Sequence, residues 1–371
     1  MGAGLAGLGE APGYSHLELT GLAVHAALAD ADIALSEVDA LYTVNQVNFL
    51  PLLSTAEYLG IRPRIVGGSN IGGSSFLEHV SSAARALQAG ACEVALICYG
   101  SNQRSARRSP NFSDHPPYEA PYRPSYMVGP FALAAARHIH EYGTTVEQLA
   151  EVAVSARAWA RLNPDAYMRD PLDVAAVRSS RMICDPLTVR DCCLVTDGAG
   201  ALVMVAADRA RDFGERAVWV LGGSPAISHR QISSMPDLTV TAAVESGARA
   251  MMMAGITPAD VDVAQIYDAF TINTVLALED LGFCKKGEGG PFVSGGRIGP
   301  GGQLPVNTNG GGLSCVHPGM YGIFLLIEAV AQLRRAAGER QVPGAEIALC
   351  HGNGGTLSSQ VTVVLGHSST L

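Results

Sequence analysis

The sequence predicts a layered α/β protein of two similar halves, and three observations lead to this prediction. First, a chain of 371 residues is longer than one hydrophobic core usually serves, so two fused units are expected. Second, apolar residues make up 48% of the chain and charged residues 16%, as in a well-buried globular protein. Third, short apolar runs alternate with segments of helical spacing in both halves, which is the order that layered α/β folds need.

The first half is expected over residues 1–210. Its clearest strand covers residues 91–99, a continuous apolar run that ends at Gly100 and is typical of a strand buried on both faces. An early Gly-x-Gly-x-x-Gly match is rejected as a dinucleotide site, because no strand can precede it. The other expected elements are a strand at 201–205 and helices at 16–32, 74–89, 131–142 and 145–162.

The second half is expected over residues 211–371 and repeats the alternation of strands and helices. The expected strands of the second half are 217–222, 261–266, 346–350 and 360–365, and its helices are 240–254, one from about 270, and 321–337.

A long loop is expected in the first half, between the strands at 91–99 and 201–205. Its residues 101–130 are rich in Pro, Ser, Arg and Tyr, and a loop of that length is usually functional.

Composition excludes several classes of protein. A net charge of -9 argues against a nucleic-acid binder, which needs a basic face. The eight cysteines show no C-x-x-C spacing, which favours reduced thiols in the cytoplasm over a disulfide framework or a zinc site. No secretory signal is expected, and no apolar run reaches the length of about 18 residues that a membrane span needs.

Four motifs, in order along the chain, resemble those of sterol-carrier-type thiolases. They are residues 184–199, Tyr267-Asp-Ala-Phe270, residues 307–319 with His317-Pro-Gly, and Cys350-His-Gly-Asn-Gly354-Gly. The resemblance implies a five-layered α/β/α/β/α core of two five-stranded halves, with a loop domain inserted at about 101–180. It also implies a homodimer and CoA thioesters as substrates. No cofactor is expected beyond the CoA of the thioester itself, and no metal.

The departures from the thiolase pattern predict a different chemistry. Asn70 stands where the family has its nucleophilic cysteine, and an amide cannot form a thioester, so the acyl-enzyme route is closed. Neighbouring serines are poor substitutes because they are out of register with that position. Tyr267 replaces an Asn or His that holds the thioester oxygen, and Tyr321 stands where the family usually has a small residue. Either tyrosine could instead be packing.

The remaining site residues follow from the resemblance. His317 is retained and is expected to support an enolate. Cys350 occupies the place of the thiolase acid–base cysteine, and an inert role in the core is equally open. Gly352 and Gly354 are expected to let the backbone approach the thioester, with the Gly352 N–H as an oxyanion donor. Asn70 is expected, with these two glycines, among the residues that bind the CoA thioester.

A pocket that binds acyl-CoA and stabilises an enolate without a nucleophile predicts a retro-aldolase. Such an enzyme cleaves a β-hydroxyacyl-CoA into a ketone or aldehyde and a shorter acyl-CoA. Tyr267 is expected beside the enolate and Tyr321 beside the β-hydroxyl as base, with the pKa of a phenol lowered by its surroundings. This combination resembles the steroid side-chain-cleaving aldolases, which implies a small OB-fold partner. The alternatives are a thiolase-like acyltransferase and a non-catalytic scaffold subunit.

Overall fold

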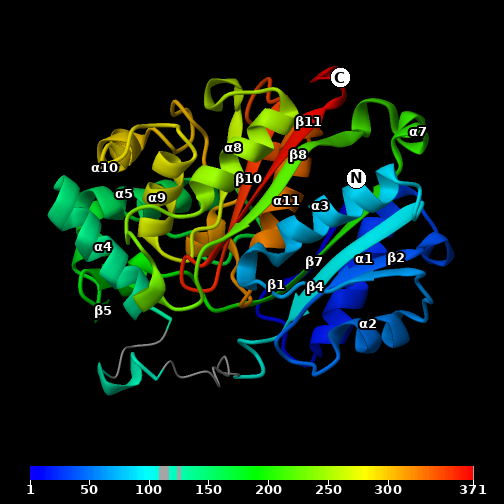
Figure 1. Cartoon of the computed structure of the whole chain (residues 1–371), viewed down its shortest axis with the longest axis horizontal. Coiled ribbons are helices and arrows are strands. Elements are labelled where there is room, and N and C mark those ends of the chain that lie inside the picture. The colour runs from blue at the N-terminus through cyan, green and yellow to red at the C-terminus, as the bar shows by residue number, and fades with distance from the viewer. Residues whose placement is uncertain (108–116, 123–126, 371) are drawn as a thin grey trace.

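The first sheet is built from strands of the first half (Figure 1). The computed structural model describes residues 1–107, 117–122 and 127–370. The strands in spatial order are β1 (Gly2–Gly9), β7 (Asp197–Val205), β4 (Val94–Ser101), β2 (Ala40–Thr43) and β3 (Ile65–Gly67). The first two pairs in this order, β1–β7 and β7–β4, are antiparallel, whereas β4–β2 and β2–β3 are parallel.

The second sheet repeats this pattern with one strand fewer. Two antiparallel pairs are again followed by a parallel pair, which is the internal repeat that the sequence predicts. The expectation of five strands is wrong for this half, because the described residues give four. The spatial order is β8 (Val218–Ile227), β11 (Ser359–His367), β10 (Ile347–Gly354) and β9 (Val263–Ile266). At the outer edge of β9, Val306 makes a single parallel bridge to Ala264 in place of a fifth strand.

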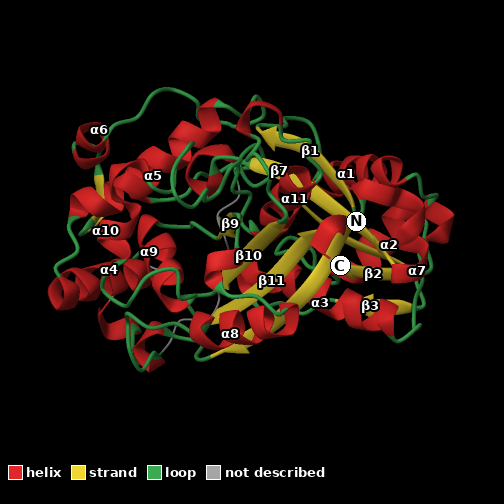
Figure 2. Cartoon of the chain, turned by 90° about the horizontal axis from the view of Figure 1, so that it is seen from above, coloured by secondary structure: helices red, strands yellow, loops and turns green. Residues whose placement is uncertain are grey.

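Two helices lie between the sheets, and four more lie on the outer faces of the sheets (Figure 2). The central pair is α3 (Ser75–Gln88) and α11 (Gly322–Leu333), and α3 contacts both β4 and β8. The helices therefore divide the molecule into the five layers predicted for a thiolase-like α/β fold. Outside the first sheet lie α1 (His16–Ala31) and α2 (Pro51–Leu59), and outside the second lie α8 (Ala243–Ala254) and α9 (Thr271–Asp280).

The segment between β4 and β7 forms a separate group of helices beside α9 (Figure 1). Part of the loop domain predicted at 101–180 lies outside the described residues. The predicted division between 210 and 211 falls, along the chain, after β7 of the first sheet and before β8 of the second. At this point α7 (Ala207–Ala210) is followed by a 3-10 segment (Arg211–Arg216). The group contains α4 (Gly129–Tyr142), α5 (Val146–Arg161), α6 (Val174–Arg178) and the hairpin of β5 (Met182–Cys184) and β6 (Leu187–Thr188), with α10 (Gly289–Val293) packed on α5.

The N-terminal ends of the two central helices, α3 and α11, meet. A Cβ on Gly322 would lie 2.3 Å from the carbonyl oxygen of Gly73, so only glycine permits this approach. The contact brings the turn before α3 against the residues before α11. Of the helices in the described ranges, none has the length and apolar character needed to cross a membrane.

Candidate active site

Tyr267, His317 and Tyr321 meet at the end of β9. The backbone N–H of Tyr267 donates to the His351 carbonyl on β10, which fixes the residue just beyond the strand. Its hydroxyl oxygen lies 3.1 Å from His317 Nε2 and accepts a hydrogen bond from the Tyr321 backbone N–H, also at 3.1 Å. The structure thus brings together three residues that the sequence places 50 and 54 positions apart.

The three rings also pack on one another. Tyr267 stands edge-on to His317 and to Tyr321, with ring centroids 5.7 and 5.6 Å apart, while His317 stacks on Tyr321 at 6.2 Å. Tyr321 is completely buried, whereas Tyr267 keeps 4% and His317 9% of its surface exposed. A substrate can therefore reach Tyr267 and His317 more directly than Tyr321.

Burial keeps all three side chains uncharged near neutral pH. Desolvation raises the pKa of Tyr267 and of Tyr321 well above the usual value for a phenol. The expectation that the surroundings lower a tyrosine pKa is therefore wrong, because the apolar packing outweighs the hydrogen bonds. Desolvation lowers the pKa of His317 to about 4, so its imidazole is neutral and one ring nitrogen can accept a proton.

Asp268 is a site residue that the sequence reasoning did not single out. Its buried carboxylate accepts hydrogen bonds from the backbone N–H of Gly312 at 2.6 Å and of Leu313 at 3.3 Å. These two residues belong to the π-helical turn Gly311–Cys315, which leads directly to His317. Desolvation raises the pKa of Asp268 to about 7. The adjacency of an acidic residue to Tyr267 was the available signal, but its burial was not visible in the sequence.

Asn70 lies in the turn between β3 and α3. Its side chain is exposed, and its Oδ1 lies 3.5 Å from the Gly72 backbone nitrogen. The Tyr267 ring packs directly on the same turn, since a Cβ on Gly73 would lie 2.3 Å from that ring. The turn that contacts Tyr267 through Gly73 thus carries an amide, Asn70, at the position expected for a thiolase nucleophile.

Cys350, Gly352 and Gly354 lie on β10. The Cys350 thiol is fully buried and faces α11, with its Sγ 3.7 Å from the Leu325 carbonyl oxygen, and burial raises its pKa. The two glycines let β10 approach the turn before α3, because a Cβ on Gly354 would lie 1.9 Å from the Ile71 carbonyl oxygen. The close approach seen here is thus to protein backbone, and the thioester role of these residues stays a prediction.

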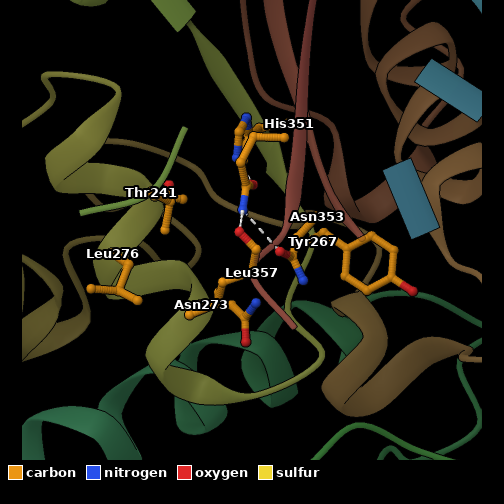
Figure 3. A pocket seen from close by; sticks show the side chains of 9 residues that line it. Thr241, Tyr267, Asn273, Leu276, His351, Asn353 and Leu357 are labelled. Carbon is orange, nitrogen blue, oxygen red and sulfur yellow. Dashed lines mark hydrogen bonds between the residues drawn. The ribbon is translucent and has the colours of Figure 1, made fainter. Parts of the chain in front are cut away.

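A small pocket adjoins Tyr267 on the outer side of the second sheet (Figure 3). His351 and Asn353 enter it from β10, and Asn273 and Leu276 from α9. The side-chain amide of Asn273 is buried, and neither its oxygen nor its nitrogen has a hydrogen-bond partner among the described residues. The described side chains contain no group of three or more His, Cys, Asp or Glu residues placed to hold a metal ion.

Comparisons with known proteins identify the family of the chain. Residues 224–367 match a family model described as thiolase C-terminal domain-like. The chain is 32% identical over 357 residues to the 17-hydroxy-3-oxo-4-pregnene-20-carboxyl-CoA lyase of Mycobacterium tuberculosis, and the match covers 90% of both proteins. It is 42% identical over 228 residues to an acetyl-CoA acetyltransferase of Methanothermobacter thermautotrophicus, a match that covers 61% of this chain and 60% of that relative.

Solved structures extend the likeness over the whole chain. A structure described as an Ltp2-ChsH2(DUF35) aldolase superposes with a TM-score of 0.86 at 30% identity, covering 99% of this chain and 98% of the other. The full-length relative, the family model and this superposition agree on one assignment. The chain belongs to the thiolase superfamily, in the branch that sterol-carrier-type thiolases share with the steroid side-chain-cleaving aldolases.

Proposed function

We propose that this protein is a retro-aldolase that cleaves the Cα–Cβ bond of a β-hydroxyacyl-CoA. The observation that carries the proposal is the 3.1 Å contact between the Tyr267 hydroxyl and His317 Nε2, beside a turn that holds Asn70 instead of a nucleophile. This pair can move a proton, and the reaction needs no covalent intermediate. The lyase and aldolase names of the full-length relative and the solved structure support the same class of reaction.

The hydrogen-bond directions suggest how the proton moves. The Tyr267 oxygen accepts the Tyr321 N–H. When the neutral His317 ring carries its proton on Nδ1, the Tyr267 hydroxyl donates to Nε2, and one lone pair of the Tyr267 oxygen is left for the substrate. The β-hydroxyl gives its proton to Tyr267 while Tyr267 gives its own to His317. The Cα–Cβ bond then breaks, the ketone leaves and the electron pair becomes an enolate. The same pair returns a proton to Cα, which restores the starting state.

This assignment changes the roles expected for the two tyrosines. Tyr321 is completely buried and has a raised pKa, so it is a poor terminal base. Tyr267 acts on the substrate because it has a proton acceptor, His317, within hydrogen-bond distance. The positive charge that the transfer creates on His317 lies beside the enolate and stabilises it.

The substrate and partners follow from the relatives. The pregnene carboxyl-CoA lyase acts on a steroid CoA thioester by its name, and we propose a steroid side chain for this protein as well. The description of the solved aldolase names a DUF35 component beside Ltp2, which supports a partner protein for this chain as well. We propose that this partner is the small OB-fold protein associated with acyl-CoA that the resemblance implies. We propose a cytoplasmic heterotetramer of two copies of each protein.

An exposed surface supports self-association. The edge strand β3 has an open side, and Val66 on it is 60% exposed. Phe49, Leu50 and Leu53, at the start of α2, are also exposed, and Leu52 of that helix contacts the residue after β3. An open strand edge beside apolar side chains suits pairing with a second copy.

One experiment separates the proposal from its alternatives. A β-hydroxyacyl-CoA is incubated with the protein in the absence of free CoA, with and without the small partner protein proposed above. Release of a ketone and a shorter acyl-CoA is the expected result. An absolute requirement for free CoA would favour an acyltransferase, the activity in the name of the acetyl-CoA acetyltransferase relative. No turnover of any acyl-CoA under either condition would favour a scaffold.

A further inference from the structure

The side chain of Asn309 lies against the hydroxyl of Tyr321. Asn309 Oδ1 is 3.0 Å from the Tyr321 hydroxyl oxygen and 2.8 Å from the Gly311 backbone nitrogen. A backbone N–H can only donate, so the amide atom that faces both groups must be the oxygen. The Tyr321 hydroxyl therefore donates its proton to Asn309, and its direction is fixed.

Tyr321 passes this constraint to the catalytic pair. Its ring is held between His317, at 6.2 Å, and Phe324, at 5.8 Å between centroids. Its backbone N–H donates to the Tyr267 hydroxyl oxygen. Asn309 thus fixes the hydroxyl of Tyr321. The backbone N–H of Tyr321 occupies one lone pair of the Tyr267 oxygen and leaves the other for the substrate.

Asn309 is itself held by the inserted helices. The backbone carbonyl oxygen of Asn309 accepts a hydrogen bond at 2.9 Å from Nδ2 of Asn163, which lies just beyond the end of α5. A Cβ on the next residue, Gly310, would lie 2.6 Å from the Cβ of Ala160. The backbone around Asn309 is therefore pressed against α5 and has little freedom to move.

We propose that Asn309 is a positioning residue for the Tyr267–His317 pair, acting through Tyr321. The inference rests on the retro-aldolase function proposed above and adds a residue that touches none of the reacting atoms. With Asn309 in place, Tyr321 is held at its hydroxyl, and its backbone N–H stays directed at the Tyr267 oxygen.

The first test is kinetic. In Asn309→Leu, the Tyr321 hydroxyl loses its acceptor, and kcat is expected to fall about tenfold, the effect of losing one hydrogen bond worth about 1.4 kcal/mol. The KM should change little, because Asn309 does not contact the substrate. A change in KM with an unchanged kcat would overturn the proposal.

A double-mutant cycle asks whether Asn309 acts through Tyr321. Asn309→Leu and Tyr321→Phe both remove the same hydrogen bond, so the double variant should be no slower than the slower single variant. The matched control is Asn273→Leu, which also removes a buried asparagine. The factor by which this control lowers kcat should multiply with the factor for Tyr321→Phe. Multiplicative losses for Asn309, or equal coupling for the Asn273 control, would overturn the proposal.

A spectroscopic readout works without turnover. With 3-fluorotyrosine placed at position 321, its 19F resonance should shift when Asn309→Leu is added and stay in place with Asn273→Leu. A shift in a protein that cleaves no β-hydroxyacyl-CoA would leave the hydrogen-bond role intact and refute only the proposed function. An unmoved resonance would overturn the inference.

If Asn309→Leu does not fold, Asn309→Asp gives the same information. The substitution keeps the shape and an acceptor oxygen, but a carboxylate accepts more strongly than an amide. The 19F resonance should then move in the direction of stronger donation by the phenol. No movement in this folded variant would again overturn the proposal.

Discussion

The Tyr267 hydroxyl oxygen lies 3.1 Å from His317 Nε2, and both side chains are uncharged in the folded protein. A neutral phenol beside a neutral imidazole can pass a proton without separating charge over a long distance. The Tyr321 N–H holds the phenol oxygen from the other side. This relationship determines which tyrosine is expected to matter most.

Tyr267→Phe should lower kcat by about 10²–10⁴-fold, the usual contribution of a general acid–base group. The ring is kept, so its packing on Gly73 and folding should be preserved. Tyr321→Phe should cost less, about tenfold, because it removes only the bond to Asn309 and leaves the backbone N–H. Steady-state kinetics with circular dichroism checks both, and a larger effect at Tyr321 would return the role of base to that residue.

Asn70→Cys should not create an efficient thiolase. The resemblance places the new thiol at the position of the family nucleophile, but it also places Tyr267 where the family has the residue that holds the thioester oxygen. Thiolysis of a 3-ketoacyl-CoA should remain at least about 10²-fold below the rate expected with an intact oxyanion site. The measurement is 3-ketoacyl-CoA consumption with free CoA, and rapid thiolysis by this single variant would contradict the account.

His351 should make folding stability depend on pH. Burial lowers its pKa to about 4, while an unfolded histidine has a pKa near 6.5. The unfolded chain therefore binds a proton first, and this stabilising contribution is lost as pH falls from about 6.5 toward 4. The stability deficit of His351→Gln relative to the native protein should shrink by about 2 kcal/mol between pH 7.5 and 5.

Urea unfolding at the two pH values measures this difference. His140→Gln, on an exposed helix face, serves as the matched substitution outside the core. A deficit for His351→Gln that stays constant with pH would show that His351 is not buried as a neutral ring.

The exposed edge strand predicts a dimer that a single charge can weaken. Light scattering should give the mass of two chains, and Val66→Lys should shift the distribution toward one chain, because lysine on an edge strand opposes strand pairing. The control for adding a charge elsewhere is Met252→Lys, at a position on α8 where the native side chain is 74% exposed. A fully active native monomer would refute the prediction.

The long helices and buried strands were predictable because their apolar spacing is regular. The helix expected at 16–32 is observed at His16–Ala31, and the strand expected at 91–99 is observed as β4 (Val94–Ser101). β1 was missed because its glycines and alanines have no strand signal. In the structure these small residues allow α1 to pack closely, since a Cβ on Gly4 would lie 2.3 Å from the Ala23 carbonyl oxygen.

The site was predictable only as a set of residues. The motifs named Tyr267, His317 and Tyr321, and the structure places them in contact. The direction of the pKa shifts was not predictable, because it depends on burial by segments distant in sequence. The same reason hid Asp268, whose carboxylate is surrounded only after the turn Gly311–Cys315 folds over it.

The central claim is cleavage through an enolate with no acyl-enzyme, and one measurement tests it most directly. A β-hydroxyacyl-CoA is turned over in D₂O without free CoA, the reaction is quenched, and the masses of the protein and the acyl-CoA product are determined. The account predicts an unmodified protein and one deuterium on Cα of the product, because the pair that protonates the enolate has exchanged with solvent. An acyl adduct on the protein, or a product without deuterium, would contradict it.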